Sequence, residues 1–269
     1  MFSTDLLAGK VAFVAGGTSG INLAIAEGFA AHGANVAVLG RRLDKAQHAA
    51  DHIRAVTGRE TLAIPADVRD YEAIDAALAS TVERFGKIDI VVSGAAGNFQ
   101  ATAVNLSTKG FQTVVDIDLV GTFNVFRAAY DHVERPGASF IAITAPNAMQ
   151  PMARQLHACA AKAGVNMLVR CLALEWGPAG IRVNAISPGP IAGTEGIGDR
   201  MMSPELRKAM EQRLPAGRLG LPSELANAAL FLGSELSSYT TGHIYDCEGG
   251  MLLGAASPET LKVMQRPTK

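Results

Sequence analysis

The sequence has few cysteines and almost no net charge, and each shortage excludes a class of protein. Its 269 residues carry a formal net charge of −1, which provides no basic field for nucleic acid or an anionic membrane. Any anionic ligand must therefore be held locally. The three cysteines, Cys159, Cys171 and Cys247, lack the paired spacing of a metal site. We expect buried free thiols, a reducing compartment and no bound metal.

Long apolar runs and recognisable targeting signals are also missing. No stretch reaches about 18 uninterrupted apolar residues, which a membrane-spanning helix needs. Residues 1–17 lack the basic region, apolar run and cleavage site of a signal peptide. The final residues, RPTK, do not match the peroxisomal Ser-Lys-Leu address. We therefore expect a cytosolic protein that does not enter a membrane.

Short apolar runs alternate with longer amphipathic runs along most of the chain. The composition, 48% hydrophobic and 18% charged, suits one domain spanning residues 1–269. The alternation predicts an α/β fold with a single parallel, doubly wound sheet of the Rossmann type and helices on both faces. The expected strands are 10–16, 35–40, 61–68, 88–97, 138–145 and 181–187, and the expected helices are 21–33, 42–56, 71–86, 110–133 and 157–176.

The segment 191–218 interrupts this alternation. Its glycine-rich start is followed by a charged, amphipathic run, which predicts an insertion with one or two short helices. Insertions of this length often act as lids over a substrate.

A glycine-rich turn follows the first expected strand and opens the first helix. Backbone amides at such a helix start receive a pyrophosphate, because glycine permits a tight turn and close approach. Asn22 stands where a further glycine is common. The residues expected to hold the cofactor here are Gly16, Thr18, Ser19, Gly20 and Ile21.

The end of the second strand carries two arginines in place of the carboxylate that would hold the ribose of NAD. Arg41 and Arg42 suit the 2′-phosphate of NADPH, because guanidinium groups bind phosphate through paired, charge-assisted hydrogen bonds. The alternative is a solvated surface pair. Asp67 and Val68, after the third strand, are expected to flank the adenine, although Asp67 could instead cap the following helix.

In combination, these motifs resemble the short-chain dehydrogenase/reductase family over nearly the whole chain. The motifs that occur in family order are the turn at 16–20, Gly94-Ala95-Ala96-Gly97, Lys162, Ser187-Pro188-Gly189-Pro190-Ile191 and Glu248-Gly249-Gly250. The resemblance implies that Lys162 binds the nicotinamide ribose. It also implies that Gly94, Ala95 and Ala96, with Pro188, Gly189, Ile191 and Thr194, contact the cofactor.

The catalytic serine and tyrosine of that family are absent. Counting from Lys162 places Ala158 at the tyrosine position and Ala145 at the serine position, with His157 and Thr144 displaced by one residue. Where the family usually has an asparagine, the chain has Asp118.

One branch of the family, the 2,4-dienoyl-CoA reductases of peroxisomal type, resembles this pattern. The shared phrases include residues 95–99, 116–118, 121–125, 157–162, 175–178 and 189–196. Glu248 departs from the branch, which usually has aspartate there, and the lid after Gly196 also differs. The resemblance implies NADPH-dependent reduction of a 2,4-dienoyl-CoA to an enoyl-CoA, with the 3-enoyl isomer suggested, in fatty-acid metabolism.

This reaction tolerates the loss of the tyrosine. Hydride added to the far end of a conjugated dienoyl thioester places negative charge on a remote thioester oxygen, so no acid is needed at the usual position. We expect Asp118 and Lys162 to be catalytic and to position the water that protonates the dienolate. An aspartate beside a lysine should stay ionised and orient that water, unless burial lets it hold a proton. Alternatively, Asp118 is a structural carboxylate bonded to nearby backbone.

The substrate residues follow the fourth strand. Asn98 and Phe99 are expected to line the acyl pocket, although Phe99 could be core, and for His157 packing or hydrogen bonding is at least as plausible as catalysis. Arg41, Lys109 and Arg200 are candidate contacts for the phosphates of coenzyme A.

The sequence also allows two rival functions. One is an NADP-dependent reductase of another activated alkene or carbonyl, with His157 or Thr144 replacing the lost acid. The other is a regulatory protein that binds NADPH without catalysis. The family resemblance implies a homo-tetramer, for which residues 164–176 and 245–256 offer apolar contact surfaces.

Overall fold

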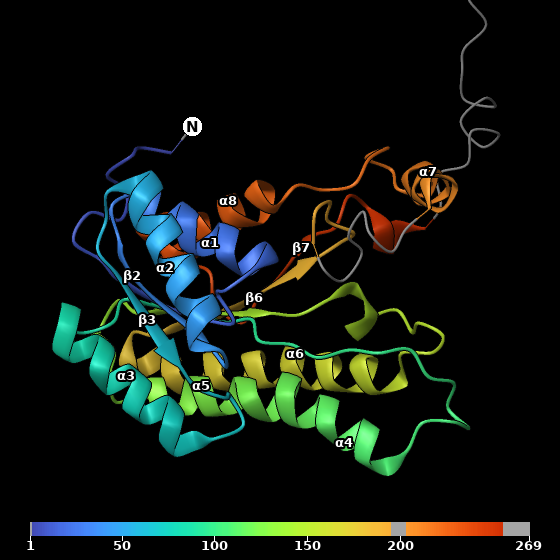
Figure 1. The fold of residues 1–269 in the computed structure, drawn as a ribbon, viewed down its shortest axis with the longest axis horizontal. Helices are drawn as coiled ribbons and strands as arrows, with labels where there is room; N and C mark the ends of the chain where they lie inside the picture. Colours follow the sequence, from blue (N-terminus) through green and yellow to red (C-terminus); the bar gives the residue numbers. More distant parts are fainter. Residues whose placement is uncertain (1, 195–202, 255–269) are drawn as a thin grey trace, which may run out of the picture.

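The computed structural model describes residues 2–194 and 203–254. Seven parallel strands form one sheet in the order β3-β2-β1-β4-β5-β6-β7 (Figure 1). Their bounds are β1 Val11–Ala15, β2 Asn35–Gly40, β3 Thr61–Pro65, β4 Ile90–Ser93, β5 Ser139–Ile143, β6 Arg182–Pro188 and β7 Ile244–Cys247. The predicted fold class is confirmed, and the sheet gains a seventh strand, β7, that the sequence patterns did not indicate.

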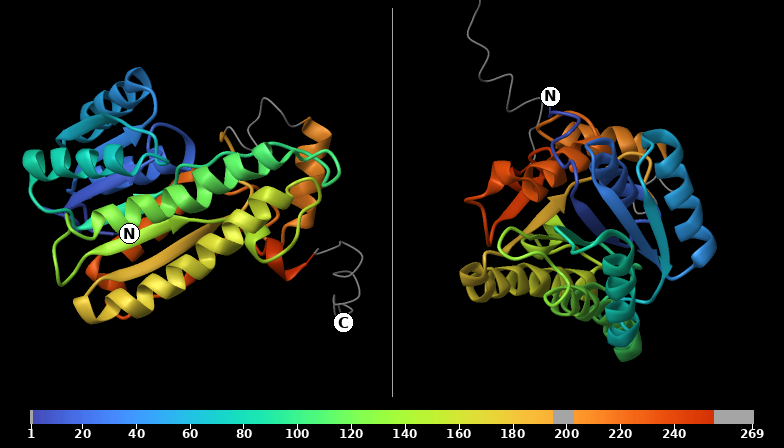
Figure 2. Two further views of the ribbon diagram at one scale, coloured as in Figure 1. Left: turned by 90° about the horizontal axis from the view of Figure 1, so that it is seen from below. Right: turned by 90° about the vertical axis from the view of Figure 1, so that its left-hand side faces the viewer.

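Helices cover both faces of the sheet, as Figures 1 and 2 show. One core cluster includes side chains of α1 (Gly20–Ala31), α2 (Leu43–Thr57) and α8 (Pro222–Gly233). The other face packs against α3 (Tyr71–Phe85), α5 (Gly121–Ala129) and α6 (Leu156–Trp176). Strands such as β1 and β4 are buried along their whole length, because both faces are covered.

The long helix expected over 110–133 is interrupted by a wider turn. α4 (Thr108–Val115) leads into a π-helical segment, η1 (Asp116–Val120), before α5 continues. Figure 2 shows this rod lying alongside α6. Periodicity along a sequence does not reveal one extra residue in a turn, and π segments are frequent at functional sites.

The predicted insertion leaves the sheet after β6 and contains α7 (Pro204–Arg213) among its described residues. Its two ends are held together by paired backbone bonds: the Ala192 N–H donates to the Gly220 carbonyl, and the Gly220 N–H donates to the Pro190 carbonyl, each at 2.9 Å. Figure 1 shows α7 standing away from the sheet. The insertion is therefore anchored at its base.

The cysteines differ from expectation in burial. Cys159, Cys171 and Cys247 are free thiols, but Cys171 is exposed and the other two are half-buried. The expectation of buried thiols is wrong because Cys171 lies on the outward face of α6. No helix in residues 2–194 and 203–254 has the length and apolar character needed to cross a bilayer.

Candidate active site

The carboxyl ends of β1 and β4 form the centre of the site, where the strand order reverses. Ala15 pairs with Ser93 at the ends of these neighbouring strands, and such switch points are where doubly wound sheets bind ligands. Gly16 has φ +81°, and a Cβ placed there would lie 2.7 Å from the Ala95 nitrogen. Only glycine lets the two turns approach this closely.

Asn22, in the first turns of α1, links the same two turns and is a residue whose role the sequence did not reveal. Its side-chain N–H donates to the Gly94 carbonyl at 2.8 Å and to the Gly16 carbonyl at 3.4 Å. A Cβ at Gly94 would lie 2.2 Å from the Asn22 amide. The asparagine therefore occupies the position of a helix-packing glycine. It links the glycine-rich turn after β1 to the turn after β4.

Replacing Asn22 by Ala should loosen this link. We expect the free energy of unfolding to fall by about 1–3 kcal/mol, because a half-buried carbonyl loses its donor, and the Kd for the nicotinamide cofactor to rise. Denaturant unfolding and fluorescence titration measure the two quantities. Unchanged stability and binding would contradict the role of Asn22 as a link.

The remaining residues of the glycine-rich turn lie at the start of α1. Ser19 precedes the helix and its hydroxyl makes no capping bond, while the side chain of Ile21 packs against the core. A Cβ at Gly20 would lie 3.9 Å from Thr194, so Thr194 faces the helix start. Thr18 packs beside Gly40 at the end of β2.

The two arginines after β2 differ in their contacts. Arg42 forms an ion pair with Asp44, two residues along the chain, and the Arg42 side chain holds the pKa of Asp44 at about 2. Arg41 is exposed and forms no hydrogen bond or ion pair within the described residues. Of the two, Arg41 has its guanidinium free for a phosphate.

Asp67 follows β3, the edge strand that pairs with β2, and lies at the same end of the sheet as the two arginines. It forms an ion pair with Arg69 at 2.6 Å; a hydrogen bond from Arg69 lowers its pKa, and the nearby positive charge of Arg41 adds to this effect. Asp67 does not cap α3, because Asp70 accepts the capping bond from the Ala73 N–H at 3.0 Å.

Val68 follows Asp67, and its side chain points into the protein interior. It is buried, and its carbonyl accepts a hydrogen bond from the Asn124 side chain at 2.9 Å. Val68 is thereby packed against α5, at the side of the sheet where the adenine was expected.

Asp118 and Lys162 form a buried ion pair. The Lys162 Nζ lies 3.1 Å from Asp118 Oδ2, and the two side chains are 9% and 2% exposed. Lys162 also donates to the Ile143 carbonyl at 3.0 Å. The second carboxylate oxygen of Asp118 accepts from the Gly97 N–H at 2.8 Å. The two residues that we expected to be catalytic are therefore in direct contact. The bond from the Gly97 backbone also agrees with the alternative, in which Asp118 is a structural carboxylate.

The π-helical segment and α6 place these two charges. Asp118 lies in η1 and is its buried residue, while Lys162 lies on the buried face of α6. The buried carboxylate and ammonium stabilise each other, because either charge buried without its partner would strongly destabilise the folded state. The pair also fixes the Gly97 loop, through the bond to Asp118.

Ala158 and Ala145, which replace the family's tyrosine and serine, provide no polar atom beyond the backbone. Ala158 is buried on α6, in the turn before Lys162. Thr144 is buried and its hydroxyl lies 3.4 Å from the Lys162 carbonyl, so it is engaged within the fold. Neither family position carries a phenol or hydroxyl, and the buried charged pair beside them is Asp118–Lys162.

The residues expected at the substrate side follow the Gly97 loop. Asn98 is exposed and donates to Gln155 at 3.2 Å. Phe99 is 44% exposed, so it is not core, and its ring stacks on His157 with centroids 4.4 Å apart. Lys109 is exposed on α4, and Arg200 lies outside the described residues.

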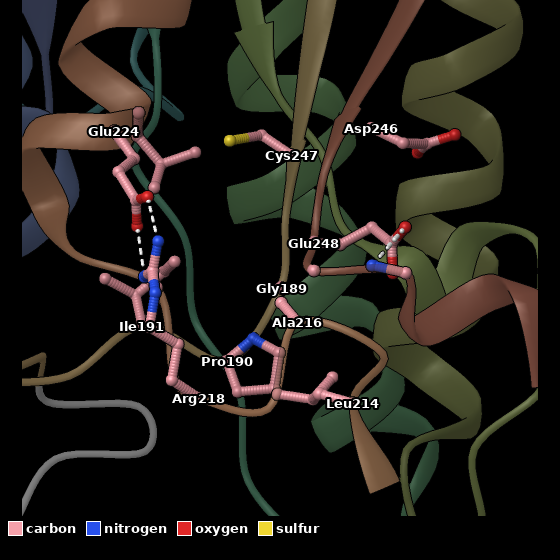
Figure 3. Close-up of a pocket in the computed structure, with 14 residues that line it drawn as sticks. Gly189, Pro190, Ile191, Leu214, Ala216, Arg218, Glu224, Asp246, Cys247 and Glu248 are labelled. Atoms are coloured by element: carbon pink, nitrogen blue, oxygen red, sulfur yellow. Dashed lines mark hydrogen bonds and ion pairs between the residues drawn. The ribbon is translucent and has the colours of Figure 1, made fainter. Parts of the chain in front are cut away.

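A cavity of about 200 Å³ lies between the turn after β6, the end of β7 and the base of the insertion (Figure 3). Gly189 and Ile191 line it, and Pro188 ends β6 beside them. Glu248, where the family branch has aspartate, uses its carboxylate to accept from the N–H groups of Gly250 and Leu252. Within the described residues, no group of three or more His, Cys, Asp or Glu could hold a metal ion.

An ion pair at this cavity gives the insertion a pH-dependent anchor. Arg218 contacts Glu224 of α8 (Figure 3) and holds the pKa of Glu224 at about 2. A lowered carboxyl pKa stabilises the fold above the unfolded value of 4.5 and loses that contribution as pH falls toward 2. We expect unfolding titrations to show a smaller loss of stability over this pH range in Glu224→Gln than in the wild type; equal losses would contradict the anchor.

The sequence is similar to a known protein family and to several known enzymes. Residues 15–252 match the model of a family described as enoyl-(acyl carrier protein) reductase. A peroxisomal 2,4-dienoyl-CoA reductase from Rattus norvegicus is 44% identical over 93% of this chain and 86% of its own length. The Danio rerio enzyme of the same name is 42% identical over 96% of this chain and 86% of its own length.

The chain belongs to the short-chain dehydrogenase/reductase family, in its 2,4-dienoyl-CoA reductase branch. It is an oxidoreductase, and its fold implies a nicotinamide cofactor. The glycine turns and the uncapped helix start described above fit such a cofactor.

Solved structures show the same fold. A putative short-chain alcohol dehydrogenase from Sinorhizobium meliloti superposes with a TM-score of 0.87 at 30% identity, covering 92% of this chain and 98% of the other. A short-chain dehydrogenase from Bacillus anthracis has a TM-score of 0.80 at 36% identity, covering 90% and 96%.

The expected cytosolic location is wrong. The rat and zebrafish relatives, and a Saccharomyces cerevisiae relative that is 38% identical over 92% of this chain, are all named as peroxisomal enzymes. Location is decided by short sequences that receptors read, not by the chemistry of a fold. The lack of a Ser-Lys-Leu ending therefore does not indicate a cytosolic protein.

Proposed function

We propose that this protein uses NADPH to reduce a 2,4-dienoyl-CoA thioester to a 3-enoyl-CoA. The observation that carries the proposal is the buried Asp118–Lys162 pair, whose lysine lies one helical turn beyond Ala158 on α6. A site for ketone reduction needs a proton donor beside the carbonyl oxygen. This site instead has the carboxylate of Asp118 and the ammonium of Lys162, with Ala158 at the tyrosine position. This arrangement is suited to protonating a carbon atom through a bound water.

The chemistry of a conjugated diene explains why that arrangement is sufficient. When bound, the nicotinamide supplies a hydride to the substrate. The resulting negative charge is delocalised over the dienolate to the thioester oxygen, where hydrogen-bond donors stabilise it. A proton must then reach a carbon atom of the dienolate. A positioned water can deliver it, and the resulting hydroxide is neutralised by a proton from solvent.

Asp118 and Lys162 position that water in this proposal. Asp118 Oδ1 is bonded to the Gly97 N–H and Oδ2 to Lys162, which leaves further lone pairs on each oxygen to accept from water. Lys162 also binds the nicotinamide ribose. Both residues are held by backbone partners, so neither must reorganise during the reaction.

NADPH, in preference to NADH, is proposed from the arginine at the end of β2. Arg41 is exposed and forms no hydrogen bond or ion pair within the described residues, and residues 39–42 at the end of β2 include no carboxylate that could hold a free ribose hydroxyl. Gly16, Thr18, Ser19, Gly20 and Ile21 would receive the pyrophosphate at the start of α1.

The names of the relatives support the substrate. The rat, zebrafish and yeast proteins are named as producing (3E)-enoyl-CoA from 2,4-dienoyl-CoA, a reaction of unsaturated fatty-acid oxidation. Asn98 and Phe99 are proposed to line the acyl site, and Arg41 and Lys109 to meet the phosphates of coenzyme A. The predicted homo-tetramer stays a prediction, supported by the exposed Met167 and Leu174 on α6, as does the single-domain organisation.

The test is NADPH oxidation by the purified protein with a short trans,trans-2,4-dienoyl-CoA, with acetoacetyl-CoA as the ketone control. We expect oxidation with the dienoyl thioester and none with the ketone. Ketone turnover would favour a carbonyl reductase that uses another acid. Binding of NADPH without turnover of either substrate would favour a regulatory role.

A further inference from the structure

The imidazole of His157 is a buried polar group without a partner. His157 lies in the first turn of α6 and is fully buried. Neither ring nitrogen makes a hydrogen bond within the described part of the chain. A neutral imidazole always carries one N–H donor, and buried donors of this kind are nearly always satisfied. Its donor is therefore available to a ligand.

The ring is linked to the proposed reaction centre through Phe99 and its loop. Phe99 stacks on His157, with ring centroids 4.4 Å apart and planes inclined by 36°. Two residues before Phe99, the Gly97 N–H is bonded to Asp118. A single short loop thus joins the imidazole to the Asp118–Lys162 pair.

Phe99 is the cover over the imidazole. It is 44% exposed while His157 is fully buried, so it separates His157 from solvent on this side. A Cβ at Gly110 would lie 2.9 Å from the Phe99 Cζ, so the ring spans from α6 to the start of α4. A half-exposed ring on a loop can turn away without disturbing the core.

The loop around Phe99 is fixed at its base by hydrogen bonds to the start of α6. The Gln155 side-chain oxygen accepts from Asn98 and from Asn147, both at 3.2 Å. The Ala101 N–H donates to the Arg154 carbonyl at 3.0 Å. One contact is made by the Asn98 side chain before Phe99 and one by the Ala101 backbone after it, so the loop is tied to the start of α6 on both sides of the ring.

We propose that His157 donates a hydrogen bond to the thioester oxygen of the substrate, and that Phe99 turns aside to admit that oxygen. This inference rests on the proposed function. The dienolate formed by hydride addition carries its charge at that oxygen, and a donor in a dry site stabilises it. No proton is transferred to the oxygen: His157 keeps its N–H, the dienolate is protonated at carbon by water, and the hydroxide left behind takes a proton from bulk solvent.

The first test removes the donor and keeps the ring. We expect His157→Phe to lower kcat by about 10²-fold, as loss of one oxyanion donor does, with the Kd for NADPH unchanged within about twofold. His157→Gln restores an N–H and should recover kcat to within about tenfold of the wild type. His48→Phe, at an exposed position on α2, is the matched control. A folded His157→Phe protein with kcat within about threefold of the wild type overturns the proposal.

The second test reports on the oxygen itself, which a merely structural histidine would not affect. A saturated acyl-CoA with ¹³C at the thioester carbonyl is bound to the protein with NADP⁺, and its carbonyl stretch is recorded by isotope-edited infrared spectroscopy. We expect a lower frequency in the wild type than in His157→Phe. Equal frequencies overturn the proposal.

A third measurement needs no variant and covers the case in which His157→Phe does not fold. The wild type should bind a saturated acyl-CoA thioester at least about tenfold more tightly than the S-alkyl thioether of equal length, which lacks the oxygen. Equal affinities overturn the proposal. Both the infrared and the affinity tests measure binding, so they remain decisive even if dienoyl-CoA is not reduced. The affinity comparison shows whether any donor meets the thioester oxygen, and the infrared comparison assigns that donor to His157. Failure of the proposed function appears separately, as absent NADPH oxidation in the wild type.

Discussion

Replacing Asp118 by Ala is expected to lower kcat for dienoyl-CoA reduction by about 10²–10⁴-fold, the range for loss of a group that directs proton transfer. The carboxylate bonds both Lys162 and the Gly97 N–H, so its loss removes the acceptor for water and leaves the Lys162 ammonium unpaired. The Kd for NADPH should change far less. Stopped-flow turnover and fluorescence titration of NADPH measure the two effects.

Two further variants separate chemistry from structure. Asp118→Asn keeps an oxygen for the Gly97 N–H but loses the charge opposite Lys162, so we expect it to remain folded and slow. Asp116 lies in the same π-helical segment but is only half-buried. The kcat of the Asp116→Ala control should stay within about twofold of the wild type. Unchanged turnover in Asp118→Ala would rule out both forms of the mechanism.

Replacing Arg41 by Ala is expected to raise KM for NADPH by about 10–100-fold and to leave KM for NADH within about threefold. The 2′-phosphate would lose a charge-assisted hydrogen-bond donor, worth about 1.5–3 kcal/mol, whereas NADH has no such phosphate. Steady-state kinetics with both cofactors at low salt measure the change. The difference should shrink as salt is added, because the site is exposed.

The neighbouring arginine is the matched control. Arg42 is occupied by Asp44, so Arg42→Ala should change KM for NADPH by no more than about threefold. A larger effect at Arg42 than at Arg41 would mean that the ion pair with Asp44 opens to receive the phosphate. Equal kinetics of Arg41→Ala and the wild type with both cofactors would remove the argument for NADPH.

The sequence alone predicted the sheet, the helices on both faces and the cofactor turn. Apolar runs of strand length alternating with amphipathic runs identify strands covered on both sides, and the glycines at 16–20 follow the first of these strands. It missed β7, whose four residues are not fully buried. A short strand with partly exposed side chains produces no apolar run.

The position of Asp118 as a candidate was also readable from the sequence, because counting along family motifs needs no coordinates. The atoms that bond the Asp118 carboxylate were not readable from the sequence. The widened π-helical turn and the bond to Gly97 depend on how α4, α5 and α6 pack, and one extra residue in a turn leaves no mark in a hydrophobic pattern. The same holds for Asn22, which stands where a further glycine is common and whose side chain bonds the Gly94 carbonyl, 72 residues further along the chain.

What the sequence by itself determined is the order of elements, the loss of tyrosine and serine, and the presence of two arginines after β2, because these are properties of residue identity and spacing. The tertiary structure decided which arginine is free, that Asp118 and Lys162 share a buried ion pair, and that His157 is left without a partner beneath Phe99. Those facts depend on distances between residues far apart in the chain, and only packing of the helices against the sheet sets them.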